Sequence, residues 1–130
     1  MSDAQKQKIL VVEDDKFLGA LFVRKLIAEG FDVGHAIDAP AAYELLSKSV
    51  PDIILLDLIL PGENGFSILE KVKKDDRIKH VPVIVFSNLG QQEDIDKTKA
   101  LGAIDFMIKA NFTLDEVVKR VRGVLEATKQ

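Results

Sequence analysis

Short apolar runs alternate with segments of helical periodicity five times along the chain. Three of the runs, 9–12, 53–56 and 83–86, have no polar alternation, which is typical of strands buried on both faces. The run 31–37 alternates more and includes Asp32 and Gly34, so we expect it at an edge of the sheet, and the last run covers 103–108. Because strands that alternate with helices pair in parallel, the pattern predicts an α/β fold with helices on both faces of a doubly wound parallel sheet.

The intervening segments carry helix signals of unequal strength. A capping box at 113–116 begins the last helix, which continues to Leu125, and Asp38 with Pro40 marks the start of the second. The segment 93–101 is more polar and only weakly amphipathic. The other two helices are predicted from apolar residues three and four positions apart: Phe17, Leu18, Leu21, Phe22 and Leu26 in the first, which Gly30 ends, and Phe66, Leu69 and Val72 in the third.

Composition narrows the classes of protein that this pattern allows. We expect residues 1–130 to form a single domain with a core of about 8–126. The net charge of −3 indicates no bulk attraction to nucleic acid or to an anionic membrane. With no cysteine, disulfides, thiolate metal sites and thiol catalysis are excluded. The start of the chain is polar and no apolar run approaches the length of a membrane span, so we expect a cytoplasmic protein without membrane insertion.

Polar side chains follow four of the predicted strands at the point where each strand ends. Glu13-Asp14-Asp15 follows the first, Asp57 the third, Ser87 the fourth and Lys109 the fifth. In open parallel sheets, ligands bind outside the carboxyl ends of the strands. Taken singly, each of these residues is a helix cap, a turn residue or a surface charge, but their joint occurrence at one edge of the sheet indicates a site.

The chemistry of such a site can be inferred from its residue types. Clustered carboxylates repel one another unless a cation neutralises them, and oxygen ligands without histidine or cysteine favour Mg²⁺. With the metal held by Glu13, Asp14 and Asp57, one oxygen of Asp57 is free to attack a phosphoryl group and form an acyl phosphate. Lys109 and Ser87 would then bind the phosphoryl oxygens.

Other candidates receive a structural interpretation. His35 and His80 are interpreted as surface or hydrogen-bonded histidines, with no other candidate ligand beside them. Phe106, three residues before Lys109, is interpreted by default as a core residue.

These residues resemble a known family, the receiver domain of two-component response regulators, also called CheY-like. The resemblance extends from Ile9 to Leu125 and depends on the segment 9–15, the segment from Asp57 to Gly65, Ser87 and Lys109. It implies a flavodoxin-like (βα)₅ fold with strand order 2-1-3-4-5. It also implies a phosphorelay protein that is not a turnover enzyme, although it accelerates its own phosphorylation and dephosphorylation.

The resemblance further assigns roles and partners. Asp57 would accept phosphate from the phosphohistidine of a sensor histidine kinase or phosphotransfer protein. Glu13, Asp14, Asp57 and the main-chain carbonyl of Ile59 would bind Mg²⁺, with Mn²⁺ as an alternative. Ser87 and Phe106 would be the switch residues. The face of the fourth helix, fifth strand and fifth helix would bind a downstream effector or a second copy, without direct contact to nucleic acid.

The chain departs from the family pattern in ways that bear on the site. Ala110 follows Lys109 where proline is usual, and we expect a trans bond there because a cis bond before a non-proline residue is costly. Asn88 replaces a small residue after Ser87, and we expect it to alter access to the phosphoryl group or the mobility of the next loop. Ile59 and Leu89 flank the path of the attacking water in this family and cannot orient it by hydrogen bonding, so we predict slow self-dephosphorylation.

Three alternatives remain open at this point. A haloacid-dehalogenase-like phosphatase also uses an aspartate nucleophile with Mg²⁺, but it needs an acid where this chain has Ile59. A flavodoxin-like cofactor binder needs a phosphate-binding loop where this chain has Glu13-Asp14-Asp15. A degenerate receiver that serves only for docking is disfavoured by the complete set of acids, hydroxyl and lysine. The cognate kinase, the output, and whether the chain stands alone or is part of a larger regulator are open.

Overall fold

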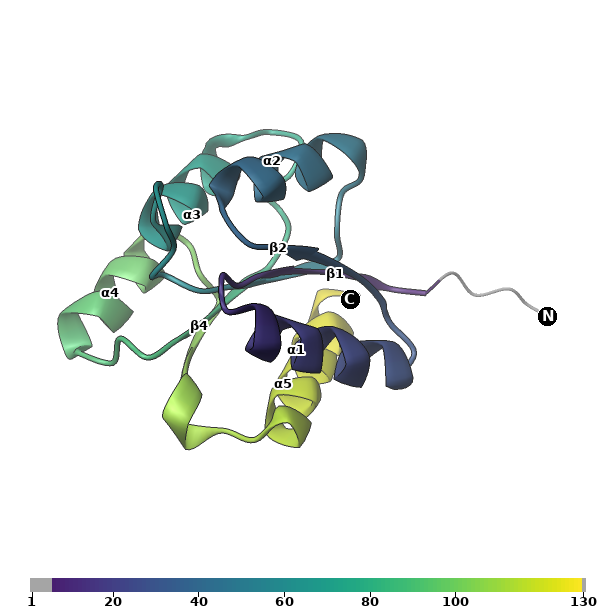
Figure 1. Cartoon of the computed structure of the whole chain (residues 1–130). Coiled ribbons are helices and arrows are strands. Elements are labelled where there is room, and N and C mark those ends of the chain that lie inside the picture. The colour runs from purple at the N-terminus through teal and green to yellow at the C-terminus, as the bar shows by residue number, and fades with distance from the viewer. Residues whose placement is uncertain (1–5, 130) are drawn as a thin grey trace.

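A five-stranded parallel sheet with the order β2-β1-β3-β4-β5 organises the computed structural model, which describes residues 6–129 (Figure 1). The flavodoxin-like strand order predicted from the family resemblance is confirmed, and so is the position of the second strand at an edge. The strands are β1 (Lys8–Val12), β2 (Asp32–Ala36), β3 (Ile53–Leu56), β4 (Val83–Ser87) and β5 (Asp105–Ile108).

The helices cover both faces of the sheet, with α1 and α5 on one side and α2, α3 and α4 on the other (Figure 1). The predicted cap of Asp38 on the second helix is present, and so is the predicted capping box at the start of the fifth. In contrast, α4 has no side-chain cap, and its buried residue is Thr98. The bounds are α1 (Lys16–Ala28), α2 (Ala39–Lys48), α3 (Gly65–Lys74), α4 (Gln92–Ala100), a short 3₁₀ helix η1 (Lys109–Asn111) and α5 (Leu114–Thr128).

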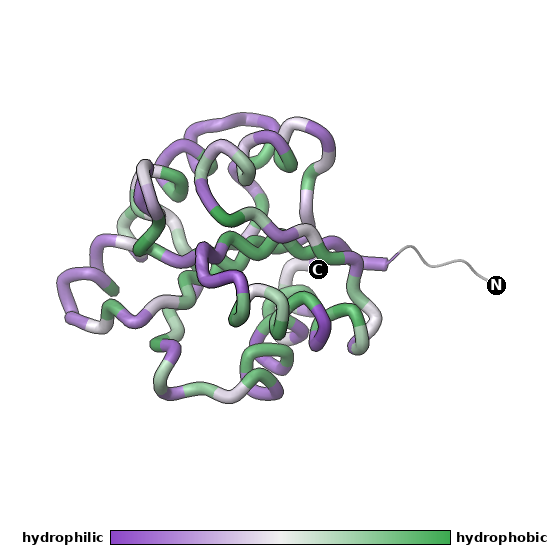
Figure 2. Tube along the Cα trace, viewed as in Figure 1, coloured by the Kyte–Doolittle hydropathy of each residue, from purple (hydrophilic) through white to green (hydrophobic). Residues whose placement is uncertain are grey.

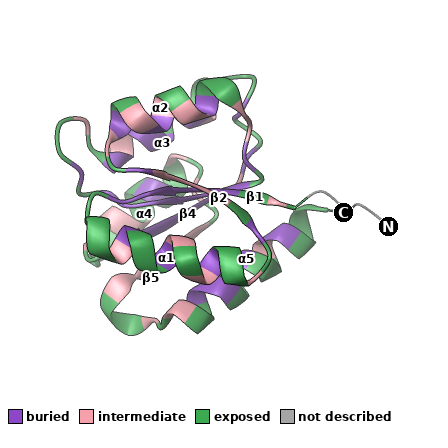
Figure 3. Ribbon diagram, turned by 45° about the vertical axis from the view of Figure 1, so that its right-hand side comes forward, coloured by how far each residue is buried: buried purple, intermediate pink, exposed green. Residues whose placement is uncertain are grey.

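Two hydrophobic clusters lie on opposite faces of the sheet and explain the unbroken apolar runs. Along β1, Ile9 and Val11 belong to the cluster under α1 and α5, whereas Leu10 and Val12 belong to the cluster under α2 and α3. Successive side chains of a strand point to opposite faces, so a strand covered on both sides must be apolar at every position. Figure 2 shows the apolar residues gathered along the sheet, and Figure 3 shows the buried faces of the helices turned toward it.

The first helix differs from the prediction in which residues it buries. Phe22 and Leu26 are buried, but Phe17 is 65% exposed and Leu21 is 38% exposed. Each residue of an α-helix turns the side chain by about 100°, so Phe17, five residues before Phe22, lies about 140° away from the core-facing direction. The predicted apolar face was therefore too wide.

The two strands with the longest predicted ranges are also shorter in the structure. Ile37 and Ile104 lie outside β2 and β5 and are exposed. Phe31 precedes β2 and is buried in the core. An apolar residue in the sequence can therefore be buried without belonging to a strand, as Phe31 is, or can lie just outside a strand and be exposed, as Ile37 and Ile104 are.

Candidate functional site

Two buried acids lie at the carboxyl ends of the neighbouring strands β1 and β3. Asp57 directly follows β3, and its backbone N–H donates to the carbonyl of Val12 at 3.0 Å. Glu13 directly follows β1, and its N–H donates to the carbonyl of Ala36 at 2.9 Å. The residues are 5% and 3% exposed, respectively. The sheet thus holds both carboxylates in place through backbone hydrogen bonds.

A single lysine connects the two acids. The Lys109 ammonium lies 2.8 Å from Oδ2 of Asp57 and 2.5 Å from Oε1 of Glu13. Lys109 is the first residue of η1, immediately after β5, and its peptide bond to Ala110 is trans, as expected. Although burial alone would lower the pKa of Lys109, the hydrogen bonds to Asp57 and Glu13 outweigh it and raise that pKa. The lysine therefore stays charged.

Burial raises the pKa of Glu13, and the Asp57 charge adds a smaller effect in the same direction. The Lys109 ammonium and the N–H of Asp15, which donates to Oε2 of Glu13 at 3.1 Å, oppose this rise. Two buried acids and one ammonium leave excess negative charge at this edge of the sheet, which favours binding of a further cation.

The acids form a group that could bind a metal. Glu13, Asp14 and Asp57 each place a carboxylate oxygen within 4.8 Å of the other two. Asp14 is exposed and the other two are buried, so the group opens to solvent on one side. Three carboxylates without nitrogen or sulfur ligands suit a hard cation such as Mg²⁺. The residues present therefore fit the predicted metal.

The other predicted site residues surround this group less closely. Ser87 ends β4 and is fully buried, with its hydroxyl accepting from the N–H of Leu89 at 3.3 Å. Asn88 is exposed and Leu89 is half-buried. Ile59 is 55% exposed, and its N–H donates to Oδ1 of Asp57 at 3.3 Å. Within residues 6–129, the Ser87 hydroxyl makes no hydrogen bond to Asp57 or Lys109.

Phe106 lies in β5, and the default interpretation of it as a core residue is wrong. It is half-buried and lines a pocket of about 260 Å³ between α4 and β5, together with Ile95, Thr98 and Ile104. The β5 residue inside the core is the next one, Met107, which is fully buried. Neighbouring residues of a strand face opposite sides of the sheet, which separates the two.

The prediction that His35 lies beside no candidate ligand is also wrong. Its Nε2 is 2.8 Å from the main-chain carbonyl oxygen of Glu13. The residues are separated by 22 positions, so no local signal in the sequence connected them. The interpretation of His35 as hydrogen-bonded is confirmed.

A second polar cluster was not predicted. One oxygen of Glu63, in the loop after β3, accepts from the Tyr43 hydroxyl and the Ser67 hydroxyl, both at 2.6 Å, and lies 3.0 Å from the Lys71 ammonium. These donors, the Ser67 hydroxyl first, lower the pKa of Glu63 to about 2. The cluster ties the loop that carries Ile59 to α2 and α3.

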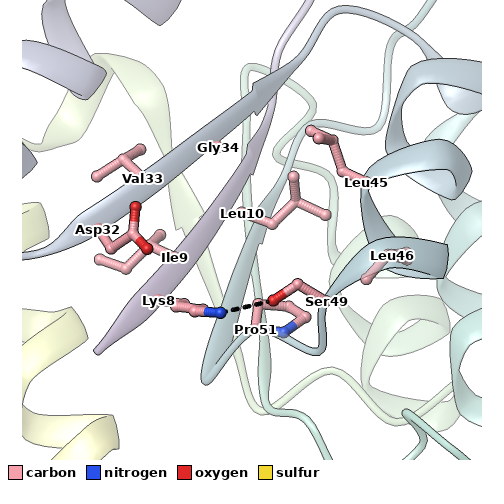
Figure 4. A pocket seen from close by; sticks show the side chains of 10 residues that line it. All are labelled: Lys8, Ile9, Leu10, Asp32, Val33, Gly34, Leu45, Leu46, Ser49 and Pro51. Atoms are coloured by element: carbon pink, nitrogen blue, oxygen red, sulfur yellow. Dashed lines mark hydrogen bonds between the residues drawn. The ribbon is translucent and has the colours of Figure 1, made fainter. Parts of the chain in front are cut away.

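An apolar pocket lies near the amino ends of the strands, at the opposite end of the sheet from the acids (Figure 4). It has a volume of about 220 Å³ and lies between the starts of β1 and β2 and the end of α2, with Leu10, Val33 and Leu45 among its lining residues. Lys8 and Ser49 are hydrogen-bonded at its mouth. None of the predicted site residues lines this pocket.

A family model described as the response regulator receiver domain matches residues 9–122. This range contains every acid, hydroxyl and lysine of the site. The chain belongs to the response regulator receiver domain family.

Relatives of this receiver domain are regulators of known classes. The chain is 34% identical over 121 residues to the DNA-binding dual master transcriptional regulator RpaA of Synechocystis, covering 93% of this chain and 50% of RpaA. It is 37% identical over 119 residues to the response regulator PleD of Caulobacter vibrioides, covering 90% of this chain and 26% of PleD. The chain thus spans half or less of the length of these relatives.

A solved structure agrees with these matches. The receiver domain of the Francisella response regulator 1452 superposes with a TM-score of 0.86 at 30% identity, covering 95% of this chain and 99% of that one. Receiver domains are the phosphoacceptors of two-component signalling, and this is the class of function of the chain. The family match favours it over the phosphatase and the flavin-binding alternatives.

In the described range, no helix of this receiver domain is long and apolar enough to cross a membrane.

Proposed function

We propose that Asp57 accepts a phosphoryl group from the phosphohistidine of a sensor kinase or phosphotransfer protein. The observation that carries the proposal is the buried arrangement of Asp57 and Glu13 around the Lys109 ammonium, at 2.8 and 2.5 Å. An aspartate carboxylate can act as the nucleophile toward a phosphoryl group, and the contact with the Lys109 ammonium balances its charge at this buried position.

The transfer balances without a further reactant. A carboxylate oxygen of Asp57 attacks phosphorus and forms an O–P bond, while the N–P bond of the donor breaks and its electron pair returns to the imidazole, which takes up a proton. Lys109 already contacts Asp57, so its ammonium is in place to bind a phosphoryl oxygen. The Ser87 hydroxyl accepts only a 3.3 Å bond, which leaves its proton available to a second phosphoryl oxygen.

The proposed cofactor is Mg²⁺, with Mn²⁺ as an alternative. Glu13, Asp14 and Asp57 would hold it through their carboxylates, and the main chain of Ile59 would supply a carbonyl. When bound, the cation offsets the charge of the phosphoryl oxygens.

The proposed donor contact is an apolar border on the same edge of the sheet. Phe17, in the first turn of α1, is 65% exposed, and Ile59, two residues after Asp57, is 55% exposed. We propose that a phosphohistidine protein covers this border when it reaches Asp57, because large exposed side chains gain burial when a partner covers them. Phe17→Ala should slow transfer from such a protein and leave phosphorylation by acetyl phosphate unchanged. Ile27→Ala, 51% exposed at the far end of α1, is the matched control.

The proposed output surface comprises α4, β5 and α5. Phosphorylation adds close to two negative charges at the edge of the sheet, and Ser87 and Lys109 are the groups beside the new phosphate. Ser87 leads into the loop before α4, and Thr98 is the buried residue of α4. Phe106 borders the pocket between α4 and β5. A rearrangement there would present a new surface to an effector or to a second copy. We place this activity in the cytoplasm, without direct contact to nucleic acid and without turnover chemistry.

The experiment that tests the proposal is incubation with Mg²⁺ and acetyl phosphate, followed by intact mass and sizing chromatography. We expect an adduct of about 80 Da, the mass of one phosphoryl group. It should be absent in Asp57→Ala and present in Asp52→Ala, a control at the exposed position immediately before β3. An adduct that survives in Asp57→Ala would contradict the proposal. A change in elution volume on phosphorylation would indicate a second copy as the partner, and an unchanged volume an effector.

A further inference from the structure

The side chain of His35 extends from the edge strand β2 to the turn that carries the proposed metal ligands. Val33, on the same face of β2, packs against the cluster under α1 and α5, so His35 faces α1 as well. The ring is half-buried, and its Nε2 lies 2.8 Å from the carbonyl oxygen of Glu13. A carbonyl only accepts, so Nε2 carries the proton and donates it.

The hydrogen bond from His35 is made at the first carbonyl of the chain after the backbone pairing between β1 and β2 ends. Val12 is the last residue of β1 paired with β2, opposite Ala36, and the N–H of Glu13 still donates to the Ala36 carbonyl. Because β2 ends at Ala36, the carbonyl of Glu13 receives an imidazole N–H in place of a backbone partner. A buried carbonyl without a partner is costly, so the imidazole N–H stabilises the turn.

The position of the ring depends on Gly19 in α1. A Cβ at position 19 would lie 2.3 Å from Cε1 and 2.4 Å from Nε2 of His35, closer than non-bonded atoms approach. Gly19 has no positive φ, so the absence of a side chain there serves close packing. The glycine and the histidine therefore form a matched pair between α1 and β2.

All four polar groups of Glu13 are consequently held. Its N–H donates to Ala36, its carbonyl accepts from His35, Oε1 accepts from Lys109, and Oε2 accepts from the N–H of Asp15. We propose that His35, seated against Gly19, is a positioning residue that fixes the Glu13–Asp14 turn for binding of a divalent cation. This inference rests on the proposed function.

The direct test compares two replacements of similar length at position 35. His35→Gln keeps an N–H donor at a similar reach, whereas His35→Met fills a similar volume without a donor. Mg²⁺ alone is titrated into the full chain and followed by two-dimensional NMR of the backbone amides. Partners that orient metal ligands contribute about 10–100-fold to affinity, so we expect about tenfold weaker binding for His35→Met and a return to within about threefold of wild type for His35→Gln.

The same spectra separate positioning from general stability. Dispersed amide signals outside residues 13–19 and 32–36 report whether each variant is folded. A role limited to packing would give His35→Gln and His35→Met the same Mg²⁺ affinity, and that result would overturn the inference.

A second variant avoids any change at position 35. Gly19→Ala improves the helix propensity of α1 but displaces the ring, so we expect weaker Mg²⁺ binding without loss of the folded state. Combined with His35→Met it should cause no further loss, because the ring that it displaces is already gone. Additive losses in the double variant would overturn the pairing of Gly19 with His35.

The outcome also separates this inference from the proposed function. Mg²⁺ binding by wild type with equal affinity in all variants would overturn the inference and leave the proposed function standing. No Mg²⁺ binding by wild type would overturn the proposed metal site, and the inference with it.

Discussion

Replacing Lys109 with methionine should destabilise the protein when no divalent cation is present. Methionine retains much of the apolar stem but removes the ammonium that lies 2.8 Å from Asp57 and 2.5 Å from Glu13. Both carboxylates are at least 94% buried at their side chains, so water compensates poorly for the lost partner. The variant therefore has two like charges side by side without compensation.

The size of the effect follows from this burial. Removing one partner of a buried ion pair typically costs about 3–5 kcal/mol. The Lys109 side chain is itself 13% exposed, and its removal also relieves the cost of burying an ammonium, so we expect the free energy of unfolding to fall by about 3 kcal/mol. Lys48→Met is a matched control, because Lys48 and Glu44 form a pair with 66% and 69% exposed side chains. Its expected cost is below about 1 kcal/mol.

The loss of unfolding free energy in Lys109→Met, called the deficit below, should depend on pH because of Glu13. Burial already raises the pKa of this carboxyl, and Lys109 opposes the rise, so the pKa in the folded variant is higher still. An unfolded glutamate titrates near pH 4.3. As the pH falls through the folded pKa toward that value, Glu13 becomes neutral in the folded variant, and the deficit relative to wild type shrinks.

Urea unfolding followed by circular dichroism measures these effects. Each protein is unfolded in EDTA and in about 10 mM magnesium chloride, near neutral pH and near pH 4, and Mg²⁺ should stabilise the variant more than wild type because the ammonium no longer competes for the oxygens. Equal stability of Lys109→Met and wild type in EDTA would refute the reasoning. A deficit that is the same at both pH values would refute the role of Glu13.

Three further predictions concern the surroundings of the site. Ile59→Asn should hydrolyse its acyl phosphate faster than wild type, because an amide can orient the attacking water; equal or slower loss of the mass adduct would contradict this. Phe106→Ala should retain phosphorylation but lose phosphate-dependent binding or dimerisation, and unchanged phosphate-dependent association would remove Phe106 from the switch. Glu63→Gln should lower the free energy of unfolding by about 1–2 kcal/mol near neutral pH, since three donors converge on one carboxylate oxygen. Because its pKa is about 2 in the folded protein and about 4.3 unfolded, that contribution is complete above pH 4.3 and disappears as the pH falls toward 2, so a difference from wild type that persists near pH 2 would contradict it.

The sequence by itself determined the order of the elements and the strand-end positions of the candidate residues. Apolar runs and helix caps are local patterns, and each depends on residues a few positions apart. They were sufficient for the edge position of β2 and for the start of α5 at its capping box. They also placed Glu13, Asp57 and Lys109 directly after strands, where a parallel sheet brings carboxyl ends to a common edge.

Only the tertiary structure decided which side chains meet. Lys109 contacts Asp57 across 52 positions and Glu13 across 96, and His35 reaches the Glu13 carbonyl across 22. The rotation of α1 left Phe17 exposed, although its sequence pattern is as apolar as that of the buried Phe22. Contacts of this kind depend on strand register and on the rotation of each helix against the sheet. Register and rotation are set jointly by the whole core, so no local segment of the chain contains them.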